Sequence, residues 1–195
     1  MLPLGGLLFV LIIAIGVGIM GVGMYNGLIS LRNQLERAWS NIDVILKQRY
    51  DEIPQLIQVI EQYAGYESGL LQKLAEARKH YGAAQSIPDK IKASQEMSLA
   101  LSGVMAIGEA YPELKANQNF VQLQSRISQL ENSIADRREA YNEAVTNFNT
   151  RIDQFPDLFA ARLLNYSRQE FFKVTEAERV APALKMNLCR FGQRA

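Results

Sequence analysis

The sequence has very few of the side chains from which catalytic and metal sites are built. His80 is its only histidine and Cys189 its only cysteine. A lone cysteine excludes an internal disulfide and any zinc or iron–sulfur site made from several thiolates, and a lone histidine excludes any site that needs two imidazoles. These absences favour a protein that is not an enzyme and that holds no metal and no cofactor.

Strand patterns, phosphate loops and an excess of charge are also missing. No segment alternates apolar and polar residues as a half-buried strand does, and a Gly-rich phosphate loop needs a strand from which to start. Lys and Arg number 21 against 20 Asp and Glu, so the chain lacks the basic excess with which proteins bind nucleic acid. The sequence predicts an all-α fold with no nucleic-acid partner.

The N-terminal region lacks charge altogether. The first charged side chain is Arg32, and the run from Leu2 to Met24 reads LPLGGLLFVLIIAIGVGIMGVGM. At about 1.5 Å per residue this run crosses a hydrocarbon core roughly 30 Å thick. It has neither the basic start nor the small-residue cleavage site of a secretory signal. We expect residues 1–25 to be a transmembrane helix in the bilayer of a bacterial-type cell membrane, with a single crossing.

Charges and small residues near this span predict its orientation and its contacts. Arg32, Arg37 and Lys47 follow the span and no cation precedes it, which by the positive-inside tendency places the large domain in the cytoplasm. Small residues four apart allow helices to approach closely in lipid. The sequence offers four of them, which we expect to form one packing ridge for a homo-oligomer: Ala14, Gly18, Gly23 and Gly27.

Beyond the span, apolar residues recur every three or four positions from Leu28 to Tyr63, which predicts a long amphipathic helix. Pro54 removes the amide donor that the Tyr50 carbonyl would receive, so a kink is expected there. Glycines at 65 and 69 predict a break. Further helices are expected over residues 70–82, 89–110 and 119–155. Short connections favour antiparallel neighbours, so residues 26–172 should form an up-and-down bundle with 173–195 as a tail.

The segment that joins the span to the first helix, MYNGLISLRNQLERAWSNIDVILKQRYDEIPQLIQVIEQYAGYE, resembles the LemA family. The later motifs Tyr141-Asn142, Asn149 and Phe155-Pro156 resemble the same family. Two departures are Tyr66, where the family usually has histidine, and Asn165-Tyr166 in place of a Gly-Phe pair. The resemblance implies a transmembrane helix, a helical bundle and membrane residence, and it implies no established reaction.

Several charged residues fall on or beside the apolar stripes of the predicted helices. We expect them to form a buried ion-pair layer that fixes the register of the helices. An alternative is a polar ligand site, which would make the protein a ligand-sensing bundle coupled to its transmembrane helix; hydrolytic catalysis is a third interpretation, although no nucleophile stands beside them. The residues are Arg49, Glu52, Arg78, Glu131, Arg137 and Arg138.

The segment from Asp157 to Phe172 mixes apolar and aromatic residues with Arg162 and Arg168. From the helix lengths, four alternating passes return Pro156 to the membrane, whereas three passes leave it at the far tip. In the first case the segment would lie in the membrane interface, or would cap the end of the bundle. The candidate interfacial residues are Phe159, Leu163, Leu164, Tyr166, Phe171 and Phe172. Together these features predict a membrane-anchored helical scaffold.

Overall fold

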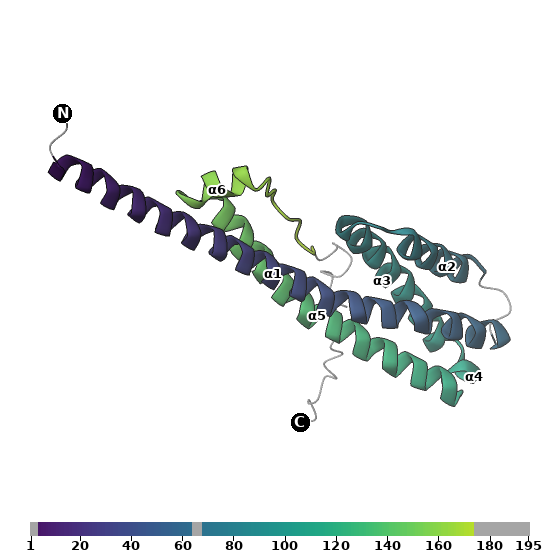
Figure 1. Cartoon of the computed structure of the whole chain (residues 1–195). Coiled ribbons are helices and arrows are strands. Elements are labelled where there is room, and N and C mark those ends of the chain that lie inside the picture. Colours follow the sequence, from purple (N-terminus) through teal and green to yellow (C-terminus); the bar gives the residue numbers. More distant parts are fainter. Residues whose placement is uncertain (1–3, 64–67, 174–195) are drawn as a thin grey trace, which may run out of the picture.

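The computed structural model describes residues 4–63 and 68–173, which contain six α-helices and no strand (Figure 1). The all-α prediction is confirmed. The helices are α1 (Leu4–Tyr63), α2 (Ser68–Ala83), α3 (Ile87–Ala110), α4 (Pro112–Lys115), α5 (Gln118–Asp153) and α6 (Asp157–Leu163).

Helix α1 combines the apolar N-terminal run and the first helix of the bundle in one unbroken element of 60 residues. Its N-terminal part projects beyond the rest of the molecule (Figure 1). Burial begins at Leu28 and continues along one face to Ile60, as the apolar stripe predicted. Pro54 lies inside the helix and does not interrupt it.

Helices α2 and α3 form a hairpin against the distal half of α1. Tyr81 of α2 donates to Asp43 (3.2 Å) and Arg78 donates to Tyr50 (3.2 Å), so α2 runs antiparallel to α1. Lys90, at the start of α3, also donates to Asp43 (2.8 Å). The break expected at glycine 65 lies outside the described residues, and Gly69 is helical within α2.

Helix α5 packs along α1 over the longest helix–helix interface of the bundle. Asn117 caps it by accepting a hydrogen bond from the amide of Phe120 (3.1 Å). Trp39 of α1 meets Tyr141 of α5 edge-on, with ring centroids 5.6 Å apart. The single-turn helix α4, which begins at Pro112 and fills the corner before α5, was not expected from the sequence.

The four passes alternate in direction, so the end of α5 returns to the membrane end of α1. Gly27 of α1 lies beside Arg151 of α5, since a Cβ atom built on Gly27 would be 3.6 Å from Nη2 of Arg151. Arg151 is close to the end of α5 at Asp153. Helix α6 follows beside α1 (Figure 1). The bundle therefore has the predicted up-and-down order, with Pro156 at the end near the span.

Candidate functional site at the membrane end and in the polar core

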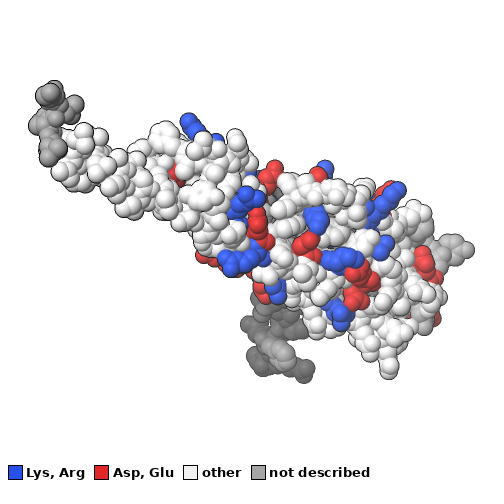
Figure 2. Space-filling view, in the orientation of Figure 1, with Lys and Arg blue, Asp and Glu red and all other residues white. Residues whose placement is uncertain are grey.

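The projecting part of α1 carries most of the large apolar side chains that are exposed in the described part of the chain. Among the described residues, α1 alone is long and apolar enough to cross a membrane, and the most apolar 18-residue window has a mean hydropathy of 2.7 with no buried residue. The face shown in Figure 2 carries no Lys, Arg, Asp or Glu along this part, while charges of both signs are mixed over the bundle. A core helix would be covered by protein, and this one is not.

The four small residues of the span do not form the single ridge that was expected. In a continuous α-helix each residue advances by about 100°, so Gly23 and Gly27 lie about 180° from Ala14 and Gly18. Gly27 faces Arg151 of α5, whereas a Cβ on Gly18 or Gly23 would meet nothing within 4 Å. The two pairs therefore occupy opposite sides of α1.

Arg49 is the centre of the polar core. Its side chain is 0% exposed and its guanidinium donates to Glu131 of α5 at 2.5 Å. The same group donates to the hydroxyls of Ser94 (2.8 Å) and Ser98 (2.7 Å) on α3. Only its Nε lacks a hydrogen bond. The Arg49 guanidinium thus joins α1, α3 and α5 through its hydrogen bonds.

The other charged residues of the predicted layer are placed separately. Glu52 pairs with Arg126, whose side chain is exposed, and Arg78 donates to the backbone of Tyr50. Arg138 lies over the ring of Phe172, with its Cζ 5.1 Å from the centroid. Arg137 is exposed at the surface. Of the six predicted residues, Arg49 and Glu131 form an ion pair with each other.

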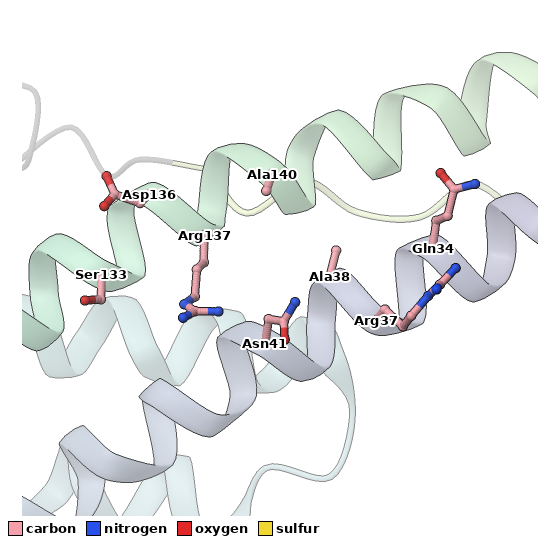
Figure 3. Close-up of a pocket in the computed structure, with 8 residues that line it drawn as sticks. All are labelled: Gln34, Arg37, Ala38, Asn41, Ser133, Asp136, Arg137 and Ala140. Atoms are coloured by element: carbon pink, nitrogen blue, oxygen red, sulfur yellow. The ribbon is translucent and has the colours of Figure 1, made fainter.

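Shallow grooves follow the seam between α1 and α5. One of ≈ 500 Å³ is shown in Figure 3, where Arg137 reaches from α5 toward Asn41 on α1 and Asp136 points away. Another of ≈ 700 Å³ runs past Glu52 and Arg126. Neither groove is lined by Arg49 or Glu131.

The titratable groups of the described part show no arrangement suited to metal binding. No cluster of three or more His, Cys, Asp or Glu side chains that could hold a metal ion occurs in residues 4–63 and 68–173. His80 lies at the surface, 2.9 Å from a carboxylate oxygen of Glu96. Burial raises the pKa of Tyr141 to about 12, and its hydroxyl donates to the carbonyl of Glu170 (3.2 Å). Burial and the nearby Asp43 carboxylate also raise the pKa of Tyr81.

The C-terminal segment divides into an exposed helix and a packed strap. Phe159 and Leu163 of α6 are 63% and 84% exposed, and Phe155 just before them is 81% exposed. In contrast Phe172 is buried, Leu164 and Tyr166 are half-buried, and Phe171 is 39% exposed. The predicted interfacial residues therefore do not share one surface.

Two asparagines of α5 hold this strap, which we define as residues 164–173. Asn149 donates to the carbonyl of Gln169 (2.9 Å) and accepts from its amide (2.8 Å). Asn142 binds both backbone groups of Phe172 in the same way (3.0 and 2.8 Å). Sequence reasoning missed this role, although both asparagines lie seven residues apart in the quoted family motifs.

The comparisons with known proteins agree with this architecture. The model of the LemA family matches residues 38–186, which is most of the chain. The chain belongs to the LemA family. The LemA protein of Metamycoplasma hominis is 26% identical over 179 residues, which cover 88% of this chain and 80% of that relative. The family and the exposed span make this a membrane-associated LemA protein.

Further relatives of this LemA-family chain carry a different name. Magnetosome protein MamQ 2 of Paramagnetospirillum magneticum is 21% identical over 76% of this chain. Magnetosome protein MamQ of Magnetospirillum gryphiswaldense is also 21% identical over 76% of it. This chain spans 64% of the length of each of these two relatives.

Proposed function

We propose that this LemA-family protein is a membrane-anchored scaffold that assembles as a homo-oligomer and holds a rigid helical bundle at a fixed distance from the bilayer. Its large domain lies on the cytoplasmic side, as the cations after the span favour. It catalyses no reaction and requires no cofactor. Its partners are the bilayer and further copies of the same chain.

The observation that carries this proposal is the continuity of α1. A helix of 60 residues is about 90 Å long, and the first buried core residue, Leu28, follows directly after the apolar run. No linker separates the part that would lie in lipid from the part that forms the core. Any surface on the bundle is therefore held at a height and direction fixed by the span, as a scaffold requires.

The polar core supports a structural rather than a sensing role. A ligand would have to displace Ser94, Ser98 or Glu131 from Arg49, and each of these already receives a short hydrogen bond. Charged groups that satisfy each other in a buried site fix the register of the helices that carry them. We therefore assign this centre to the alignment of α1, α3 and α5.

Self-association is favoured by the bare surface of the span. Ala14, Gly18 and Gly21 lie within about 60° of one another on one side of α1, and a Cβ at either glycine would meet nothing of its own chain within 4 Å. Small residues on one side let two helices approach closely in lipid, where van der Waals contact drives association. This side is directed away from α5.

The experiment that tests the proposal is the mass of the full chain in mild detergent, measured by light scattering with the detergent contribution subtracted. We expect a multiple of the chain mass of 21.9 kDa. A single-chain mass at every protein concentration would contradict the assembly. Orientation is tested in intact cells with a membrane-impermeant maleimide on a Lys90→Cys, Cys189→Ser variant. Labelling before the membrane is opened would contradict the cytoplasmic placement.

A further inference from the structure

We propose that the protein has a second contact with the bilayer, made by α6 and the residue that precedes it. In this arrangement Phe155, Phe159 and Leu163 insert their side chains into the interfacial layer of the membrane that α1 crosses. The inference rests on the proposed anchoring by α1. It adds a lateral contact that a single span would not provide.

The three side chains form one exposed apolar surface. They are spaced four residues apart and are 81%, 63% and 84% exposed, although each is large and apolar. The rings of Phe155 and Phe159 meet edge-on, with centroids 6.0 Å apart. A cluster of this kind exposed to water is unfavourable and marks a contact surface.

The depth of this surface follows from its neighbours. Arg151 lies beside Gly27, and α5 runs antiparallel to α1, so the end of α5 points toward the N-terminal end of α1. Helix α5 ends at Asp153, so Phe155 lies in the turn just after it, near the end of the uncharged run of α1. No charged residue of α1 precedes Arg32. The Phe155 end of the cluster therefore lies close to the point at which the span enters the bilayer.

The orientation of α6 is fixed by its inner face. Asp157 and Ala161 are buried, and a carboxylate oxygen of Asp157 lies 2.9 Å from Nε of Arg151. Phe159 and Leu163 are about 200° from these residues on the helix, so they point outward. The strap that follows is hydrogen-bonded to α5 at Gln169 and Phe172. The apolar face is therefore held away from the bundle.

Lipid suits this surface better than a second copy of the chain. The Phe155 end of the cluster follows Arg151, which lies beside Gly27, so a bilayer that receives the span lies next to the cluster. Arg162 and Arg168 are exposed near it, and arginines beside an apolar helix face can extend to the headgroups while the apolar side enters the acyl boundary. The surface thus has the composition of an interfacial helix.

The test uses single cysteines in the full-length Cys189→Ser chain, each carrying a nitroxide spin label, in vesicles of phosphatidylcholine and phosphatidylglycerol. The test sites are Phe159→Cys and Leu163→Cys. Ile15→Cys in the span is the lipid reference. Val121→Cys is the matched control, because Val121 is an apolar residue 46% exposed at the far end of α5. Collisions with oxygen, which enters lipid, are compared with collisions with a water-soluble nickel chelate.

We expect labels at 159 and 163 to favour oxygen several-fold more than the label at Val121 does, and to approach the value at Ile15. Values equal to that of Val121, with Ile15 in lipid, would overturn the second contact and leave the anchor intact. A water-exposed label at Ile15 would instead contradict the anchor itself. Labels shielded from both reagents, with spin–spin broadening that disappears on dilution with unlabelled chain, would assign the surface to a second copy. Circular dichroism of each variant confirms that the helices are intact.

Discussion

Arg78 donates its Nε–H to the carbonyl oxygen of Tyr50 at 3.2 Å, and this carbonyl is the one that Pro54 leaves unpaired because proline has no amide hydrogen. The guanidinium also lies over the Tyr50 ring, 4.1 Å from its centroid. A side chain of α2 thus replaces a missing backbone donor of α1. This contact explains how α1 continues through the proline.

We predict that Arg78→Met lowers the free energy of unfolding by about 1.5–3 kcal/mol, the range for a hydrogen bond to a charged group. In a Pro54→Ala background the new amide binds the Tyr50 carbonyl, so the same substitution should cost less. Denaturant unfolding of the four chains gives this coupling as a double-mutant cycle. Equal costs in both backgrounds would show that Arg78 acts only by stacking on the ring.

The Arg49 centre leads to a larger expected effect. Arg49→Met should lower the free energy of unfolding by about 3–5 kcal/mol, because Glu131 would lose its buried partner. The matched control is Arg37→Met, an exposed arginine of the same helix, which should change it by no more than about 0.5 kcal/mol. Replacing Arg49 and Glu131 together by methionine should recover much of the loss. An unchanged melting temperature for Arg49→Met would contradict the role of the centre.

The attachment of the strap to α5 can be tested by replacing the side-chain amide of Asn149 with a carboxylate. In the parent, the Asn149 side chain accepts from the Gln169 amide and donates its NH₂ group to the Gln169 carbonyl. Asn149→Asp keeps the acceptor but replaces the donor with a carboxylate oxygen, which repels that carbonyl. We expect a loss of about 1–3 kcal/mol and earlier cleavage of the strap by protease. Asn147→Asp, at an exposed position two residues earlier, is the control. Equal protease sensitivity of the two variants would contradict the pinning of the strap.

Paired substitutions can distinguish how much each side of the span contributes to self-association. Gly18→Leu with Gly21→Leu should reduce the assembled mass in detergent, because bulk on this side keeps the helices apart. Gly16→Leu with Gly23→Leu changes the opposite side and should reduce it less. A Cβ added at any of these four positions would meet no atom within 4 Å other than the adjoining backbone of its own helix, so the protomer fold should survive. Identical masses for parent and both variants would reject α1 as the contact.

High pH should destabilise the bundle through its buried tyrosines. The pKa of Tyr141 is raised from about 10 to about 12, so its contribution to stability is complete below pH 10 and is lost as the pH rises through 12. Tyr81, whose pKa is also raised, acts in the same direction. Tyr141→Phe should make the alkaline fall in stability smaller. Far-UV circular dichroism against pH measures the loss of helical structure, and tyrosinate absorbance measures the ionisation of tyrosine. Identical curves for parent and variant would contradict this assignment.

The helices were predictable because their apolar stripes are long and regular. Leu28 to Ile60 and Phe120 to Ile152 repeat over many turns, and burial follows that repeat. The one-turn helix α4 was missed because a proline after a helix end reads as a loop. The strap was missed because its hydrogen bonds join side-chain amides to an extended backbone, which has no period in the sequence.

Charged positions were harder to assign than apolar ones. A cation on an apolar stripe indicates burial or a partner, and Arg49 has both. The stripe does not identify the partner, since Arg126 on an exposed part of α5 is the residue that reaches Glu52. Arg137 lies beside the stripe and is nevertheless exposed, because a long side chain at the edge of a helix interface can turn toward water.

Because α1 is unbroken, the side of the span through which copies meet also determines how the bundle of each copy is oriented in the assembly. Gly27, which faces α5, lies on the opposite side of the helix from Ala14 and Gly18. If the spans meet through Ala14 and Gly18, α5 is turned toward the periphery of the assembly. The position of a few small residues in the span would thus determine which side of the bundle faces outward from the assembly.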